Sequence, residues 1–179
     1  MIDVRRITAE NAGDLKLKND PFVMPGRMIP RLEEGKWSYR IERFDHPEDM
    51  TFPEENYDLE ALDQEGAIAL GAYIDGVCVG LAVLKPGFLK YMYVYDLKVS
   101  ADYRRKGIGQ ALIQEALQQA RQLGYIGLYL QAQDNNVNAC LFYLRTGFVI
   151  GGFDNRVYTG TSQEGKADIL FYTAQEAAL

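Results

Sequence analysis

The pattern of apolar and polar residues becomes regular at Ala67 and stays regular to Tyr172. Two apolar runs flank Asp75-Gly76, a dipeptide typical of a two-residue β-hairpin turn. Two later segments repeat apolar residues at helical spacing, and runs typical of strands lie between and after them. The predicted elements are strands at 67–74, 77–84, 91–99, 125–132, 148–153 and 168–172, and helices at 108–123 and 136–146.

Both predicted helices have recognisable ends. The first has one apolar stripe and stops before Gly124, because glycine readily takes the left-handed conformation that follows a helix. Asp134, Asn135 and Asn136 offer good N-cap chemistry for the second helix, and Gly147 follows its last turn. The stripe of the first helix consists of Ile108, Leu112, Ala116, Ala120 and Leu123.

The first 66 residues are less regular. Asp3 to Thr8 alternate weakly and predict an opening strand, and Thr8 is a suitable N-cap for a short helix. From Asn19 to Pro53 the pattern breaks up, and five of the six prolines fall there. Trp37 to Phe44 could form a strand or an aromatic lid. We predict an irregular substrate-binding region at about 19–66.

This order of elements predicts an α+β fold with a mixed sheet. The chain has 179 residues, of which 47% are hydrophobic and 25% charged, as in an ordinary globular protein. We therefore expect one domain spanning residues 1–179.

The charge is distributed unevenly along the chain. The formal net charge is −6, which disfavours nucleic acid as a partner. Residues 42–65 contain ten acidic residues and one basic residue, a net charge of −9 with His46 neutral. Residues 98–106 carry four basic residues against one acidic residue. This asymmetry suggests one cationic and one phosphorylated ligand, although the acidic run could instead be a solubilising loop.

Other features favour a cytosolic protein. Cys78 lies in a strand pattern and Cys140 in a helical one, so two reduced thiols are expected. The N-terminus lacks the features of a signal peptide, and the apolar runs are too short to span a bilayer. We expect no membrane partner. The oligomeric state, a homodimer included, is left open by the sequence.

The loop before the first predicted helix has the chemistry of a diphosphate-binding site. Arg104, Arg105 and Lys106 lead directly into Gly107-Ile108-Gly109. A helix start offers unpaired N–H groups and partial positive charge, and glycines let the backbone approach an anion. The P-loop motif is absent, and the dinucleotide-binding fingerprint would need glycine at Leu112.

What remains is R-x-x-G-x-G between a strand and a helix, and it resembles the acyl-CoA pyrophosphate loop of the GNAT superfamily of N-acetyltransferases. The segment 136–148 is similar to that family's N-x-x-A-x-x-x-Y-x-x-x-G-F signature. Two motifs in the right order identify the chain as a member. The resemblance implies a mostly antiparallel sheet flanked by helices and acetyl-CoA as co-substrate, with no metal.

A longer run resembles one group within that family. Residues 131–140 and 147–154 contain the Asn-Asn-Val, Ala-Cys and Gly-Gly-x-Asp elements of the streptothricin acetyltransferases. Those enzymes also have an acidic stretch before the hairpin, and they acetylate the β-lysine amine of a strongly cationic antibiotic. The resemblance therefore implies a cationic amine substrate. The acidic residues expected to bind it are Glu54, Glu55, Asp58 and Asp63.

The resemblance also assigns the residues around acetyl-CoA. The backbone N–H groups of Arg105 to Gly109 would hold the pyrophosphate, with charge from Arg104, Arg105 and Lys98. Many family members have glycine at 105, so the Arg105 side chain is expected to reach the adenosine 3′-phosphate. A splayed strand near residues 97–99 would bond the acetyl oxygen. The full expected set is Leu97, Lys98, Val99, Arg104, Arg105, Lys106, Gly107, Ile108, Gly109, Gln110, Asn136 and Tyr143.

Tyr143 is the candidate that stabilises the departing thiolate. On a helix starting near Asn136, residues 136, 139/140 and 143 share one stripe, which we expect to face the ligand. Val137, Leu141 and Leu144 would then form the core stripe. A phenol near pKa 10 would stabilise a thiolate by a hydrogen bond as readily as by full proton transfer.

The base that deprotonates the amine is harder to identify. We predict Asp96, although a carboxylate of the acidic segment acting through water is an alternative. His46, the single histidine, lies in a polar segment beside Pro47 and fits a surface position. One histidine supports neither a Ser-His-Asp triad nor a His/Cys metal site.

The prediction is an acetyl-CoA-dependent N-acetyltransferase acting on streptothricin and conferring resistance. One alternative is acetylation of a protein lysine, a protein N-terminus or a polyamine. A second alternative is a non-catalytic acyl-CoA sensor, which the presence of Tyr143 beside an intact loop disfavours.

Overall fold

The predicted hairpin around Asp75-Gly76 lies in an antiparallel sheet. Asp75 and Gly76 have φ angles of 48° and 81°, the left-handed values that a tight hairpin turn requires. The strands run in the spatial order β1-β4-β5-β6, and each pairs with its neighbour in antiparallel register. Their bounds are β1 (Asp3–Arg6), β4 (Ile68–Ile74), β5 (Val77–Lys85) and β6 (Tyr91–Val99).

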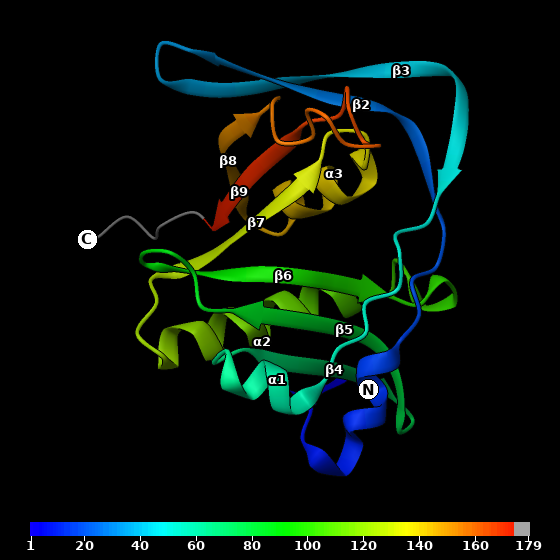
Figure 1. Cartoon of the computed structure of the whole chain (residues 1–179), viewed down its shortest axis with the longest axis vertical. Coiled ribbons are helices and arrows are strands. Elements are labelled where there is room, and N and C mark those ends of the chain that lie inside the picture. Colours follow the sequence, from blue (N-terminus) through cyan, green and yellow to red (C-terminus); the bar gives the residue numbers. More distant parts are fainter. Residues whose placement is uncertain (174–179) are drawn as a thin grey trace. The chain divides into compact units, whose positions relative to one another are not determined.

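Helix α2 (Ile108–Gln122) covers one face of this sheet (Figure 1). Four of its five predicted stripe residues are buried, and Leu112 is fully buried. A Cβ built on Gly80 of β5 would lie 3.0 Å from side-chain atoms of Ile108 and Leu112, so glycine allows this close packing. Leu123 was predicted in the stripe, but it is 56% exposed because α2 ends at Gln122.

The opposite face of the sheet packs against two short helices, the 3₁₀ helix η1 (Ala9–Lys16) and α1 (Leu59–Gln64). Thr8 stands at the start of η1 as predicted, and its N–H donates to Asn11 Oδ1 at 2.8 Å. The buried cluster on this face consists of Ile7, Leu15, Leu62, Ala67, Ala69, Leu81 and Val83.

The structure is a computed structural model that describes residues 1–173. Contacts between residues divide the described chain into two units. The first contains Met1–Pro21 and Thr51–Leu128, which include the sheet above, and the second contains Phe22–Met50 and the described residues from Tyr129 onward. The expected single domain over residues 1–179 stays a prediction, and its last six residues lie outside the described range.

The second unit contains three neighbouring antiparallel strands and one helix besides residues 22–50. Strands β8 (Phe148–Asp154) and β9 (Asp168–Thr173) pair with each other, and β9 pairs with β7 (Gly127–Gln133). Helix α3 (Val137–Arg145) packs against β8. The Asn136 side chain accepts from the Ala139 N–H, so Asn136 is the N-cap among the three candidates.

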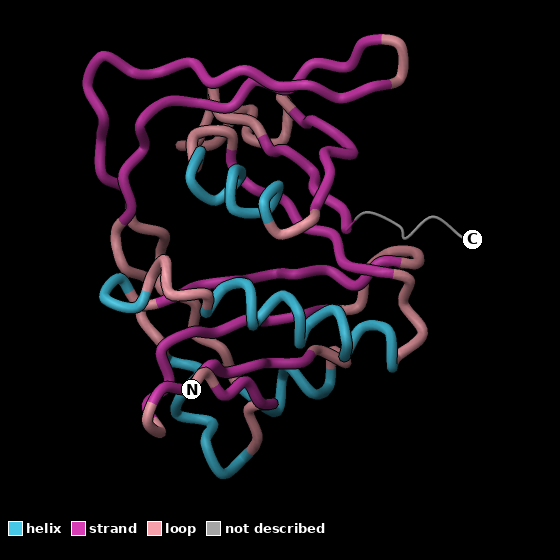
Figure 2. Tube along the Cα trace, turned by 180° about the vertical axis from the view of Figure 1, so that it is seen from behind, coloured by secondary structure: helices cyan, strands magenta, loops and turns pink. Residues whose placement is uncertain are grey.

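The expected irregular region is wrong over much of its length. Residues 22–50 form a long antiparallel hairpin of β2 (Phe22–Glu33) and β3 (Lys36–Met50), visible as two adjacent runs joined by a short turn in Figure 2. Trp37 to Phe44 therefore lie in a strand. In a two-stranded sheet each strand has a free edge, so proline can stand where a missing N–H breaks no ladder bond. The prolines between residues 19 and 53 therefore wrongly suggested an irregular segment.

Gly26 lies where the register of this hairpin shifts between Met24 and Gly26. A Cβ at Gly26 would lie 2.0 Å from Glu42 O and 2.8 Å from Arg43 Cα. Because both obstacles are backbone atoms, we expect Gly26→Ala to destabilise the protein by about 3 kcal/mol in urea unfolding. Gly13→Ala is the control, since a Cβ there meets nothing within 4 Å. Equal stability of the two variants would contradict the expectation.

Candidate active site

The predicted anion-binding loop lies at the start of α2. Gly107 is the N-cap residue with φ 83°, and no side chain among the described residues caps the helix. The N–H groups of a first helical turn have no partner inside the helix, so this start keeps donors for an anion. Ile108 is buried and can offer only its backbone to a ligand, whereas Gln110 is exposed. Gly109 is half-buried.

Two cations of the loop are exposed beside these donors. Arg105 has φ 62°, a left-handed value that is strained for any residue with a Cβ. Lys106 lies with Nζ 5.1 Å from the centre of the Tyr103 ring. Backbone donors and exposed cations together fit the diphosphate of acetyl-CoA. A left-handed φ at position 105 suits the glycine that many family members have there.

Arg104 makes contacts that the sequence motif did not predict. Its guanidinium donates to the Pro21 carbonyl at 2.7 Å, the Asp20 carbonyl at 3.0 Å and the Val99 carbonyl at 3.1 Å. Asp20 adds a second link, because its carboxylate accepts from the Ala101 N–H at 2.6 Å. Through these three bonds to backbone carbonyls Arg104 holds the loop in place. The motif pattern could not show this, since the partners are far away in sequence. The expected charge contribution of Arg104 to the phosphate stays a prediction.

We therefore expect the two arginines to behave differently. Arg105→Ala should raise KM for acetyl-CoA about ten-fold without lowering the melting temperature, because its side chain is exposed. Arg105→Gly should weaken binding equally while stabilising the fold by about 1 kcal/mol through relief of the left-handed φ. Arg104→Ala should instead destabilise the protein by about 2 kcal/mol. Thermal unfolding and acetyl-CoA titration check these outcomes, and a stable Arg104→Ala variant would contradict the structural role.

A β-bulge in β6 determines where Asp96 lies. Val83 of β5 is opposite Asp96, and Leu84 is opposite Val94, so the extra residue on β6 is Tyr95. Residues opposite each other share a face of a sheet. Val83 belongs to the cluster under η1 and α1. The bulge thus turns Asp96 to the face opposite α2.

The neighbours of Asp96 on β6 follow from the same register. Lys98 is opposite Leu81, another residue of that cluster, so it shares the face of Asp96. Leu97 and Val99 alternate with Asp96 and Lys98 along β6, so they lie on the other face of the sheet, which α2 covers. Their expected backbone contact with the acetyl oxygen stays a prediction.

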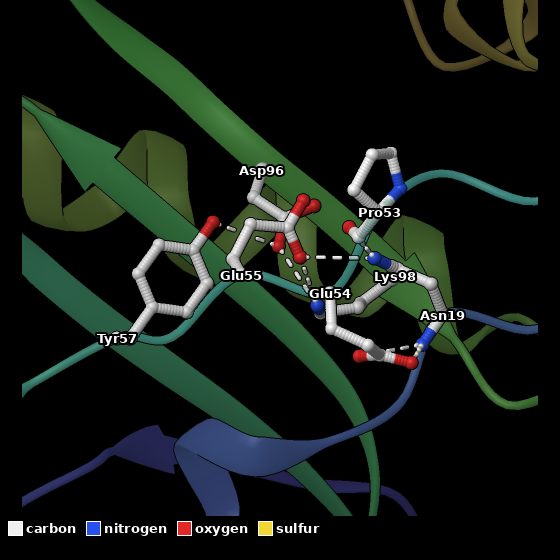
Figure 3. A network of polar contacts seen from close by, with 7 residues as sticks. All are labelled: Asn19, Pro53, Glu54, Glu55, Tyr57, Asp96 and Lys98. Carbon is white, nitrogen blue, oxygen red and sulfur yellow. Dashed lines mark hydrogen bonds and ion pairs between the residues drawn. The ribbon is translucent and has the colours of Figure 1, made fainter.

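Asp96 and Lys98 belong to a polar network drawn in Figure 3. Lys98 Nζ lies 2.8 Å from Glu55 Oε2 and 3.2 Å from Asp96 Oδ2. The Tyr57 hydroxyl donates to the same Asp96 oxygen at 3.0 Å. Asn19 Nδ2 donates to Glu55 Oε2 at 3.0 Å. The Lys98 ammonium is thus bound by two carboxylates, whereas it was expected from the sequence to contribute charge at the pyrophosphate.

Burial and charge compete in this network. Burial raises the pKa of Asp96, and the Glu55 charge adds to that, while the Lys98 ammonium and the Tyr57 hydroxyl oppose it without cancelling it. Burial alone would lower the pKa of Lys98, but the carboxylates of Asp96 and Glu55 raise it overall. Burial and the same two carboxylates raise the pKa of Tyr57, so its hydroxyl keeps its proton.

The four acidic residues predicted to bind substrate lie in different environments. Glu54 accepts from the Asn19 N–H at 3.1 Å, and Glu55 belongs to the network around Lys98. Asp58 is the N-cap of α1 and accepts from the Ala61 N–H at 3.0 Å. Asp63 is exposed and lies 3.6 Å from Arg6. Of the four, the structure brings only Glu55 together with Asp96.

Tyr143 and Asn136 belong to the second unit, whereas the anion-binding loop and Asp96 belong to the first. The predicted division of α3 into faces is only partly correct. Val137 is buried as predicted, but Cys140 and Tyr143 are buried as well, and Leu141 and Leu144 are partly exposed. The ring of Tyr143 has its centre 5.7 Å from the ring centres of both Phe148 and Phe171. These aromatic neighbours come from β8 and β9, which could not be paired with α3 from helical periodicity. Its expected contact with thiolate stays a prediction.

Sequence reasoning missed Tyr57 and Asn19. Tyr57 lies among acidic residues that were interpreted by charge alone, and Asn19 lies at the edge of the proline-rich region. An aromatic hydroxyl between carboxylates was the available signal for Tyr57. Nothing in the sequence pattern indicated Asn19.

Three further findings concern residues 1–173. They contain no group of three or more His, Cys, Asp or Glu side chains placed to hold a metal ion. The helices of this part of the chain are too short or too polar to cross a bilayer. Cys78 and Cys140 are both free thiols, as expected.

Comparisons with known proteins bear on the whole chain. Streptothricin acetyltransferase A of Bacillus subtilis (strain 168) is 34% identical over 169 residues, covering 94% of this chain and 98% of that protein. Streptothricin acetyltransferase of Streptomyces lavendulae is 32% identical over 114 residues, covering 63% and 59%. A protein from Bacillus anthracis str. Ames, provisionally named a streptothricin acetyltransferase and solved with acetyl coenzyme A, superposes with a TM-score of 0.88 at 28% identity, covering 98% and 99%.

The model of the acetyltransferase (GNAT) family matches residues 30–148, which include both motifs found in the sequence. The predicted fold class, the mostly antiparallel sheet with flanking helices, is confirmed by the structural likeness. The co-substrate is acetyl-CoA, as that solved relative carries it. The chain therefore belongs to the GNAT acetyltransferase family and is an acetyl-CoA-dependent N-acetyltransferase.

Proposed function

We propose that this enzyme acetylates the β-lysine amine of streptothricin and so confers resistance to it. The observation that carries the proposal is the 34% identity to streptothricin acetyltransferase A of Bacillus subtilis over 94% of the chain. The acidic segment supports it independently, because a polycation gains favourable electrostatic energy from a region with ten carboxylates. The carboxylates of Glu55 and Asp96 would attract a small cationic amine of this class. We expect the enzyme to act in the cytosol.

Acetyl-CoA supplies an acyl group on a thioester, which an amine can attack. In our proposal the N–H groups of Arg105 to Gly109 bind its diphosphate, and the exposed side chains of Arg105 and Lys106 add charge. Asn136 would contact the co-substrate from the second unit. These residues would bind and orient acetyl-CoA. The proton transfers are assigned to Asp96 and Tyr143.

Asp96 is proposed as the base. A free alkylammonium group near pKa 10.4 would not readily give its proton to a carboxylate. The attacking species is therefore the neutral amine, formed by loss of one proton to solvent. Its nitrogen becomes positively charged and far more acidic as the bond to the acyl carbon forms, so transfer of a second proton to Asp96 becomes favourable at that stage. The raised pKa of Asp96 helps in the same direction, because it makes the carboxylate a stronger proton acceptor.

Tyr143 is proposed to stabilise the leaving sulfur. As the carbon–sulfur bond breaks, the phenol O–H would donate a hydrogen bond or its proton to the thiolate. One proton of the attacking amine thus goes to Asp96, and the acyl group goes to nitrogen. The sulfur leaves as CoA thiolate, which becomes the thiol when it takes a proton from Tyr143 or from solvent.

The test is release of CoA thiol with three amines measured side by side. Streptothricin, spermidine and a lysine-containing peptide are offered at equal concentrations, and kcat/KM is compared. We expect streptothricin to exceed the others by at least about 100-fold, since specificity follows differential transition-state binding. Fast release only with spermidine or the peptide would keep the enzyme class and contradict the substrate. No release with any amine would favour the alternative of an acyl-CoA sensor.

A further inference from the structure

We propose that Tyr57 and Lys98 are positioning residues for Asp96, holding its carboxylate by Oδ2 so that Oδ1 meets the substrate amine. This inference deepens the proposed function, because it rests on Asp96 acting as the base. It assigns a role to Tyr57, which neither the motifs nor the charge pattern singled out.

The first support is the geometry of the carboxylate. Among residues 1–173, the donors to Asp96 are the Tyr57 hydroxyl at 3.0 Å and Lys98 Nζ at 3.2 Å, and both bind Oδ2. Two donors on one oxygen fix the rotation of the carboxylate plane and leave the other oxygen for a third partner. The Asp96 side chain is 15% exposed, so a partner can reach it.

The second support is that both donors are themselves held in place. Lys98 Nζ is bound by Glu55 at 2.8 Å, and Asn19 in turn holds that carboxylate (Figure 3). The Lys98 side chain is only 9% exposed, so its ammonium has little freedom to leave. The ring of Tyr57 packs edge-on against Tyr95, with ring centres 6.4 Å apart. A carboxylate held by preorganised donors needs no reorganisation when the substrate arrives.

The third support is the charge of the network. The ionisable groups that face Asp96 among the described residues are Lys98 on its own strand, and Glu55 and Tyr57 from the segment before α1. With Tyr57 neutral, two carboxylates and one ammonium leave one net negative charge. A substrate ammonium would neutralise it, so the network favours binding of a cation at the base. Tyr57 keeps its proton and donates, which makes it a positioning residue and not an acid.

The experiment compares Tyr57→Phe with Tyr95→Phe. Tyr57→Phe removes the hydroxyl from Asp96 and keeps the ring, whereas Tyr95→Phe removes a neighbouring hydroxyl that does not bind Asp96. The Tyr57 bond lowers the pKa of Asp96, so its loss should raise that pKa. Since the base must be ionised, the acid limb of kcat/KM should move to higher pH by roughly one unit. We expect kcat to fall about ten-fold, KM for acetyl-CoA to stay constant, and Tyr95→Phe to resemble wild type.

A second readout does not depend on activity. Carbon-13 NMR of side-chain carboxyl groups, with Asp96→Asn used to assign the resonance, reports the pKa of Asp96 directly in each variant. An upward shift in Tyr57→Phe alone supports the inference. An unchanged pKa and acid limb in a folded Tyr57→Phe protein would overturn it. If Asp96→Asn itself keeps full activity and its acid limb, the proposed base fails, whatever NMR shows for Tyr57→Phe.

Discussion

Asp96→Asn is expected to lower kcat for acetyl transfer by about 10²- to 10⁴-fold, the range over which a positioned general base acts. The amide has nearly the shape of the carboxylate but cannot accept the amine proton. The proton that the nitrogen releases as it attacks must then go to solvent. The residual rate of the variant should rise with pH toward the pKa of the amine, near 10.4, because only the neutral amine attacks and its fraction grows over that range. Steady-state kinetics from pH 6 to about 10 check both parts of this expectation.

Stability should change little in the same variant. The Asp96→Asn substitution would cost Lys98 one of its two anionic partners, but it would also remove a charge that burial disfavours. Because the two effects oppose each other, we expect a change below about 2 kcal/mol in the free energy of unfolding. Glu60→Gln is the control, since Glu60 is exposed and its side-chain contact within residues 1–173 is a hydrogen bond from Gln64. Loss of activity in both variants, or in neither, would contradict a specific role for Asp96.

The elements predicted correctly depend on local sequence. The Asp75-Gly76 hairpin needs two left-handed residues in succession, and the dipeptide itself provides them. The N-cap at Asn136 is likewise a contact between residues three positions apart. The anion-binding loop is also local, because a helix start carries its own donors. These features can be read from short stretches for that reason.

The features that were missed depend on pairing between distant segments. The β2–β3 hairpin contains three prolines, which a single-sequence reading takes as breaks although the edges of a two-stranded sheet tolerate them. The side of the sheet that Asp96 faces is determined by the bulge at Tyr95, and a bulge is defined only relative to β5. Arg104 found its partners in Asp20 and Pro21, far from its own motif. A motif can indicate that a residue matters without showing what it binds.

Tyr143→Phe is expected to lower kcat by about 100-fold and to leave the KM for acetyl-CoA nearly unchanged. The phenyl ring keeps the contacts with Phe148 and Phe171, so the variant should fold normally and lose only the hydroxyl. The effect should appear in kcat because the hydroxyl is proposed to act on the sulfur only as the bond to carbon breaks. Single-turnover measurements of CoA release separate this step from product dissociation.

A purely structural Tyr143 would behave differently. Its ring is buried among aromatic side chains, and that packing alone would account for a tyrosine at the end of α3. In that case Tyr143→Phe would keep its kcat, and only a larger truncation such as Tyr143→Ala would matter, through a loss of about 3–5 kcal/mol in stability. Tyr125→Phe, outside every proposed site, controls for the general effect of removing a phenol. A loss of kcat confined to Tyr143→Phe, in a protein that melts like wild type, would assign the hydroxyl to the chemistry rather than to the core.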